Sequence, residues 1–336
     1  ITQHKVDAEK EILITVGAHE ALHCAILGHV NPGDEVIIIE PFYDSYPTMV
    51  KLAKGIPVYV PLRLKNGYSS RNFKLDAKEL ESKFTSKTKM IIVNTPHNPT
   101  GKVFTYEELN MIAKLSKKYN TLVLMDETYE WMLFDNLKHI RMNTLPGMWQ
   151  RTITIGSSGK TFSATGWKIG YAYGPEKFIE AMFLMHLNID ASCATPLQEA
   201  LAVVLETEVA RLNQQSSYFL QVSALLQRKR DRLVKLFKKV NINGVIPDAG
   251  FFFLADYSKL AKQVNYSSET GRTEDVKFSK WLSKNKKLLP TPASSLYSIQ
   301  HEYLAEKWIR LSFARSDETL DEVEEIINEF SESLAE

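Results

Sequence analysis

The sequence contains little cysteine. Its 336 residues include only two cysteines, Cys24 and Cys193. Two cysteines cannot form a disulfide framework, and their spacing is not that of a zinc site. We therefore expect both to be small buried residues of a protein that keeps its thiols reduced.

The sequence also lacks an excess of charge of either sign and any long apolar run. Its 41 Lys and Arg residues are balanced by 40 Asp and Glu residues, so the formal net charge is +1. Such a chain has no bulk electrostatic reason to bind nucleic acid or an anionic membrane. No apolar stretch approaches the ~20 residues of a membrane helix. We expect neither nucleic acid nor membrane as a partner and a cytoplasmic location, with the mitochondrion as the alternative.

The sequence does contain short apolar β-type runs that alternate with helical patterns. These runs lie at residues 12–16, 36–39, 58–60, 90–93, 122–125 and 152–155. A capping box at Thr105–Glu108 opens one of the intervening helices. Because strands that alternate with helices form parallel sheets covered on both faces, we expect an α/β fold. The prediction is a large domain over residues 1–210, built on a mostly parallel sheet with helices on both faces.

The pattern changes beyond about residue 210. Residues 214–239 predict one long amphipathic helix, and residues 266–275 predict a polar loop. Residues 308–313 predict a strand, and residues 320–330 predict a closing helix. We therefore expect a smaller α+β C-terminal domain over residues 211–336.

The segment with the most chemistry follows the predicted strand at residues 152–155. It reads SSGKTFSATGWK and spans residues 157–168. Parallel-sheet proteins bind ligands where such strands end. Lys160 would there offer an amine for covalent attachment, while the hydroxyl residues and Lys168 would suit a phosphate.

Six segments, in order, resemble those of the fold-type I, class I pyridoxal-phosphate aminotransferases. Within this family the chain is most similar to the kynurenine aminotransferase and cysteine-S-conjugate β-lyase group. The segments are EPFYDSY (40–46), NTPHNPTGKVF (94–104), DETYEWM (126–132), LPGMW (145–149), GSSGKTFSATGWKIG (156–170) and WIRLSF (308–313). The resemblance runs from Ile12 to about Phe330. It implies pyridoxal 5'-phosphate as cofactor, amino acids and 2-oxo acids as substrates, and a homodimer.

The resemblance gives Lys160, Asp126 and Tyr129 catalytic roles. Lys160 would form a Schiff base with the cofactor and later move the substrate Cα proton, for which nearby cations lower its pKa. Asp126 would keep the pyridine nitrogen protonated. Tyr129 and Asn98 would hydrogen-bond the ring oxygen of the cofactor.

The remaining matches concern the cofactor phosphate, the cofactor ring and the substrate carboxylate. Backbone N–H groups at a helix N-terminus bind anions, so Ala18 and His19 would hold the phosphate through their main chain. Ser157 and Lys168 would add a hydroxyl and a charge. Tyr43 would stack on the pyridine ring. Arg310 would bind the substrate carboxylate with its bidentate fork, beside Asn98.

We therefore expect ping-pong transamination between an L-amino acid and a 2-oxo acid. The amino acid would be of the kynurenine, glutamine or aromatic type, and cysteine S-conjugates would undergo β-elimination as a side activity. Ala191, Ser192 and Leu296 are smaller than the group's usual residues near the substrate, which argues against an aromatic preference. Thr128 replaces a more usual aliphatic residue, and we expect no effect from it.

Two alternative interpretations remain. Family members begin well before the position of Ile1, so one alternative is a cofactor-binding but inactive homologue without the N-terminal segment and with an incomplete small domain. The other is a zinc protease, because His19–His23 spells HExxH. We expect no metal, since a strand-to-helix junction at His19 would fray the motif and no third histidine ligand is evident.

Overall fold

The computed structural model describes residues 4–212 and 214–334. Its largest element is a seven-stranded sheet with the order β1-β9-β8-β7-β6-β2-β3. Neighbouring strands from β8 to β3 run parallel, whereas β9 is antiparallel to both β1 and β8. The strands are β1 (Ile12–Val16), β2 (Glu35–Glu40), β3 (Ile56–Pro61), β6 (Thr88–Asn94), β7 (Leu122–Asp126), β8 (Thr152–Ser157) and β9 (Ile169–Tyr173). The predicted mostly parallel sheet is confirmed.

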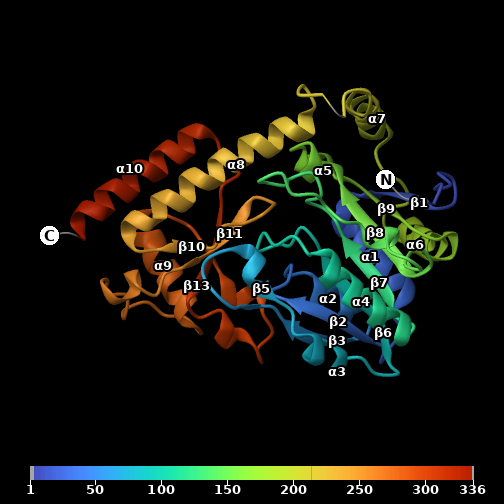
Figure 1. Cartoon of the computed structure of the whole chain (residues 1–336), viewed down its shortest axis with the longest axis horizontal. Coiled ribbons are helices and arrows are strands. Elements are labelled where there is room, and N and C mark those ends of the chain that lie inside the picture. Colours follow the sequence, from blue (N-terminus) through green and yellow to red (C-terminus); the bar gives the residue numbers. More distant parts are fainter. Residues whose placement is uncertain (1–3, 213, 335–336) are drawn as a thin grey trace.

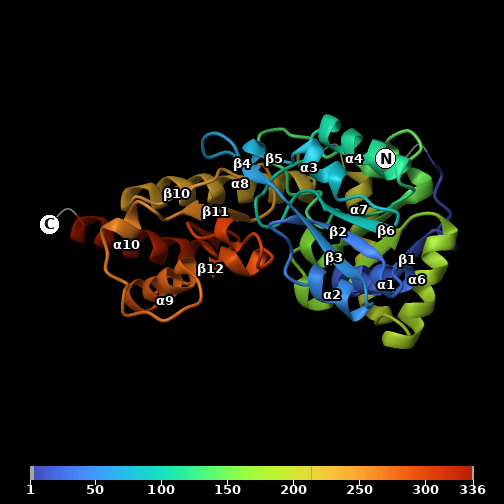
Figure 2. The ribbon, with the colours of Figure 1, turned by 90° about the horizontal axis from the view of Figure 1, so that it is seen from below.

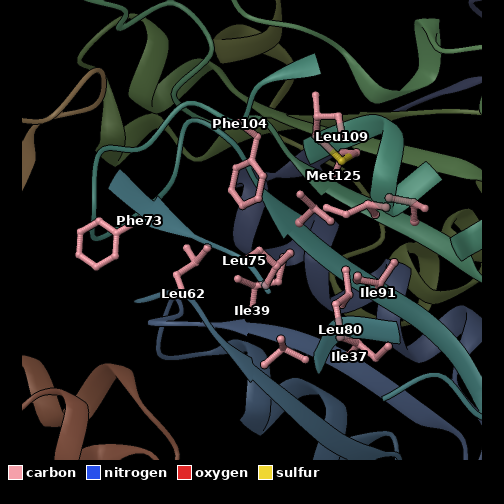
Figure 3. Packing of buried hydrophobic residues seen from close by; sticks show 14 of the residues in the cluster. Ile37, Ile39, Leu62, Phe73, Leu75, Leu80, Ile91, Phe104, Leu109 and Met125 are labelled. Atoms are coloured by element: carbon pink, nitrogen blue, oxygen red, sulfur yellow. The ribbon is translucent and has the colours of Figure 1, made fainter. Parts of the chain in front are cut away.

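Helices cover both faces of this sheet because its central strands are apolar on both sides. In β2, Ile37 and Ile39 face a core formed with α3 (Ala77–Ser82) and α4 (Tyr106–Lys118). Figure 3 shows this core, in which Leu80 of α3 and Leu109 of α4 pack with strand residues such as Ile37 and Ile91. The other residues of β2, Val36 and Ile38, face a second core, formed with α1 (Gly17–His29), α2 (Tyr46–Leu52) and α6 (Glu176–Ile189). Burial on both faces explains the near-continuous apolar runs of these strands.

A second sheet lies in the C-terminal part of the chain. It is antiparallel, with the order β10-β11-β13-β12. Its strands are β10 (Asn243–Gly244), β11 (Phe252–Asp256), β12 (Thr291–Pro292) and β13 (Trp308–Ser312), and its helices are α8 (Tyr218–Phe237), α9 (Glu274–Lys286) and α10 (Asp317–Ser333). Figure 1 shows this α+β part beside the large sheet, with α8 and α10 packed together. The domain boundary between residues 210 and 211 stays a prediction.

The remaining strands and α-helices are β4 (Arg63–Leu64), β5 (Phe73–Lys74), α5 (Ser158–Thr161) and α7 (Thr195–Ala210), and β4 pairs with β5 in a small sheet of their own. Among the described residues, no helix combines the length and apolarity needed to cross a membrane.

Two sequence predictions differ from the structure in the C-terminal part. The long helix begins at Tyr218 rather than at residue 214. The predicted loop over residues 266–275 ends at Thr273, which caps a helix that the sequence analysis did not predict, α9. Glu274 and Asp275 lie in the first turn of α9, where acidic side chains interact favourably with the helix dipole.

Candidate active site

All ten residues nominated from the sequence line one cavity of about 260 Å³. The cavity lies where the parallel strands β6, β7 and β8 end, at Asn94, Asp126 and Ser157. The ten residues are Ala18, His19, Tyr43, Asn98, Asp126, Tyr129, Ser157, Lys160, Lys168 and Arg310. This is the edge at which open parallel sheets bind ligands.

Asp126 places a buried carboxylate in the cavity. Its Oδ2 accepts a hydrogen bond of 2.5 Å from the Tyr46 hydroxyl. Its Oδ1 accepts hydrogen bonds from the Thr128 backbone N–H at 3.1 Å and the Thr128 hydroxyl at 2.5 Å. Burial raises the pKa of Asp126, and the hydrogen bonds from Thr128 and Tyr46 act in the opposite direction. The expectation that Thr128 has no effect is therefore wrong, because its hydroxyl holds this carboxylate.

Lys160 presents an amine whose surroundings favour the neutral form. It lies in the short helix α5, and its Nζ is 5.2 Å from the centre of the Phe251 ring. Burial lowers the pKa of Lys160, and the positive charges of Lys168 and Arg310 lower it further. Asp126 acts in the opposite direction. A lysine with a lowered pKa has more of the unprotonated, nucleophilic amine near neutral pH.

One end of the cavity is suited to an anion. Helix α1 begins at Gly17, and its N-cap residue, Val16, provides no side-chain cap, so the first N–H groups keep the capacity to bind an anion. Gly170 of β9 allows the start of α1 to pack directly against this strand, because a Cβ at position 170 would lie 2.3 Å from the backbone nitrogen of Ala18. Lys168 lies beside Gly17 and adds a positive charge.

Arg310 lies on β13, lines the cavity and donates hydrogen bonds to two polar side chains. Its Nη1 donates to Oδ1 of Asn98 at 3.3 Å, and its Nη2 donates to the Thr291 hydroxyl at 3.4 Å. Its Cζ lies 4.3 Å from the centre of the Phe252 ring. In the described part of the chain no carboxylate forms an ion pair with this guanidinium. Arg310 is half-buried because one side opens onto the cavity.

The aromatic side chains of Tyr43 and Tyr129 also line the cavity. The Tyr43 hydroxyl lies 3.2 Å from Nδ1 of His19, and the Tyr129 ring packs edge-on against Phe251 at 5.3 Å. Sequence reasoning missed Asp44 and Phe252, which also line the cavity. Asp44 had a signal in its position directly after Tyr43 in EPFYDSY, whereas Phe252, at the start of β11, has no nominated neighbour in the sequence.

Three positions expected to influence substrate preference lie away from the cavity lining. Leu296 is buried in the core, and its carbonyl accepts a hydrogen bond from the Phe42 N–H at 2.8 Å. Ala191 and Ser192 are exposed between α6 and α7. Within a single chain, these three residues therefore do not contact a ligand bound in the cavity.

The structure does not support the zinc-protease alternative. The HExxH segment is helical throughout, so the expected fraying at His19 is wrong. The Glu20 side chain is buried, and its two oxygens are engaged by Nδ1 of His186 and by the Val16 N–H. Within residues 4–212 and 214–334, no three His, Cys, Asp or Glu side chains gather in a group that could hold a metal.

Comparisons with known proteins give a consistent result. Residues 2–327 match the family model of aminotransferase class I and II. The chain is 46% identical to human kynurenine–oxoglutarate transaminase 3, over 98% of this chain and 73% of that protein. Among solved structures it resembles Bna3p of Saccharomyces cerevisiae, with a TM-score of 0.92 and 30% identity over 98% of this chain and 79% of that one. N-succinyldiaminopimelate aminotransferase of Mycobacterium tuberculosis gives a TM-score of 0.86 and 33% identity, with the same coverage. The chain therefore belongs to the class I and II aminotransferases, which are pyridoxal-phosphate-dependent enzymes.

Proposed function

We propose that this aminotransferase exchanges the amino group of an L-amino acid of the kynurenine, glutamine or aromatic type with a 2-oxo acid in a ping-pong reaction. One observation carries the proposal. A single cavity combines the Lys160 amine, the buried Asp126 carboxylate and an arginine that pairs with no carboxylate of residues 4–212 and 214–334. The kynurenine–oxoglutarate transaminases among the relatives support the substrate class.

The cavity fits pyridoxal phosphate. Lys160 would hold the aldehyde carbon covalently, Asp126 would face the pyridine nitrogen, and the N-terminus of α1 would hold the phosphate. The position of that N-terminus depends on Gly170, because a Cβ there would collide with the backbone of Gly17 and Ala18. When bound, the cofactor supplies an electron sink that lets the Cα–H bond of the substrate break.

The residues of the chain would bind the substrate and move its proton. Arg310 would take the substrate carboxylate in a bidentate ion pair, and Asn98 would keep the guanidinium in place through its Oδ1. Once displaced from the cofactor, the Lys160 amine would accept the Cα proton and return it at another carbon. Both roles need the unprotonated amine that burial and the neighbouring cations favour.

The same proton abstraction accounts for the proposed side activity. A cysteine S-conjugate carries a thiolate leaving group on Cβ. Loss of its Cα proton to Lys160 would allow the C–S bond to break, and addition of water would give pyruvate, ammonium and the free thiol. Arg310 would hold the carboxylate of this substrate as it does in transamination.

We also propose that two copies of the chain form a homodimer. Helices α6 and α7 expose several large apolar residues: Phe183, Leu184, Leu187, Ile189, Val203, Leu205 and Val209. Only Leu201 and Glu208 of α7 are buried, and the helix lies at the margin of the molecule in Figure 1. Such a patch is typical of a protein–protein interface. The cytoplasmic location stays a prediction.

An amino-acid panel tests the proposed function. The purified protein, saturated with pyridoxal phosphate, would be assayed with kynurenine, glutamine, phenylalanine and an S-aryl cysteine, each with a 2-oxo acid. We expect transamination of at least one of the first three and pyruvate release from the fourth. If the cofactor binds but no amino acid changes its absorption spectrum, the protein is a cofactor-binding homologue without this activity.

A further inference from the structure

The glutamate of the HExxH segment has a partner far away in the sequence. Nδ1 of His186, on α6, lies 2.6 Å from Oε1 of Glu20, on α1. Both side chains are about nine-tenths buried, with 6% and 7% of their surfaces exposed. The two helices lie side by side under the sheet (Figure 2). An ionised carboxylate only accepts hydrogen bonds, so the imidazole is the donor.

Glu20 also controls the first turn of α1. Its other oxygen, Oε2, accepts a hydrogen bond from the backbone N–H of Val16, the N-cap residue. The carboxylate thus satisfies the N-cap N–H and leaves the following N–H groups, those of Gly17, Ala18 and His19, to face the cavity. The remaining contact, from the Cys24 thiol at 3.6 Å, is weak.

This arrangement places a negative charge close to the proposed phosphate site. A carboxylate in the first turn of a helix competes with a phosphate for the positive end of the helix dipole. Burial strengthens the repulsion between two such anions, because water screens them less. His186 offsets part of this repulsion by donating a hydrogen bond to the Glu20 carboxylate. Lys168 and the His19 ring line the cavity, on the side where the phosphate would lie.

We propose that Glu20 and His186 are positioning residues for the cofactor phosphate. Glu20 holds the first turn of α1 in its anion-binding geometry, and His186 offsets the charge that this contact brings. The pair acts on phosphate affinity and does not touch the reacting atoms. The inference rests on the cofactor that the family uses and is independent of which amino acid is transaminated.

Binding constants of the cofactor-free protein test this proposal. The protein is titrated with pyridoxal 5'-phosphate and with pyridoxal, which lacks the phosphate, and binding is followed by absorbance. We expect His186→Leu, which loses the hydrogen-bond donor to Glu20, to raise the Kd for pyridoxal phosphate about tenfold and to leave the Kd for pyridoxal unchanged. Glu20→Gln combined with His186→Leu removes both the carboxylate charge and its donor and is expected to restore most of the affinity.

Three results would overturn the proposal. They are an unchanged Kd for pyridoxal phosphate in His186→Leu, an equal loss of affinity for pyridoxal, and a double variant that binds pyridoxal phosphate as poorly as the single one. His29→Gln, at the other end of α1, is the matched control and is expected to change neither constant.

Glu20 variants provide a second test that remains decisive if His186→Leu does not fold. Glu20→Gln keeps an acceptor for the Val16 N–H, whereas Glu20→Ala loses it. We expect only the alanine variant to bind pyridoxal phosphate more weakly, with pyridoxal binding unchanged in both. Equal phosphate affinity of the two variants contradicts the proposal.

Discussion

Tyr46 donates a 2.5 Å hydrogen bond to the carboxylate of Asp126, which lies 80 positions further along the chain. Both groups are buried, and Thr128 occupies the second carboxylate oxygen. A hydrogen bond to a charged group stabilises the charged form. The hydroxyl of Tyr46 therefore helps to keep Asp126 ionised. In that form the carboxylate would keep the pyridine nitrogen of the cofactor protonated, which the ring needs in order to act as an electron sink.

Tyr46→Phe is expected to lower kcat about tenfold, since a hydrogen bond to a charged group contributes about 1.5–3 kcal/mol. Loss of the bond raises the pKa of Asp126, so the carboxylate protonates at higher pH. The acid limb of the kcat–pH profile should therefore move to higher pH. Tyr106→Phe, an exposed tyrosine on α4, is the control and should leave the profile unchanged. A reduced kcat with an unmoved acid limb would argue against this role.

Lys168→Gln is expected to make Lys160 react at higher pH. The charge of Lys168 lowers the pKa of Lys160, so its removal raises that pKa. The neutral amine then appears only at higher pH. The rate at which the cofactor-free protein reacts with pyridoxal, measured against pH, reports this shift without involving the phosphate. Lys177→Gln, on α6, is the control, and an equal shift in that variant would contradict the explanation.

Arg310→Gln is expected to reduce kcat/KM for L-amino acids about 100-fold, because the substrate carboxylate loses a charged, bidentate partner. A primary amine without a carboxylate should react at the same rate in both proteins. Arg310→Lys keeps the charge but loses the fork, so its loss should be intermediate. Equal losses for amino acid and amine would show that Arg310 does not select the carboxylate.

Phe183→Glu and Val209→Glu are expected to convert a dimer into monomers, because each places a charge in the apolar surface of α6 and α7. Light scattering coupled to size-exclusion chromatography measures the mass directly. Leu52→Glu, at an exposed position on α2, is the control and should remain dimeric. A monomeric wild-type protein would remove the basis of this prediction.

Local sequence patterns predicted the elements of the large domain well, because those elements depend on local chemistry. The capping box forms as expected: Thr105 and Glu108 exchange hydrogen bonds of 3.0 and 3.3 Å between side chain and backbone. The ten nominated residues came mainly from the resemblance to the aminotransferase family, and the fold brings all of them to one cavity. Their exact roles depend on the cofactor and stay predictions.

Contacts between distant segments could not be predicted from the sequence. HExxH satisfies a zinc-protease pattern locally, yet a histidine 166 positions later binds its glutamate. Tyr46 looks like a core aromatic residue until the fold brings its hydroxyl to Asp126. Helix α9 was missed because polar residues dominate both the loop before it and its exposed face. The contacts of Glu20 and Tyr46 are tertiary contacts, and no local pattern encodes them.

The covalent attachment of the cofactor to Lys160 tests the central claim most directly. The protein saturated with pyridoxal phosphate is reduced with borohydride, digested, and analysed by mass spectrometry. We expect loss of the visible absorption band and the cofactor mass on the peptide that contains Lys160, with neither in Lys160→Ala. Label on a different lysine, or transamination retained by Lys160→Arg, would contradict the account.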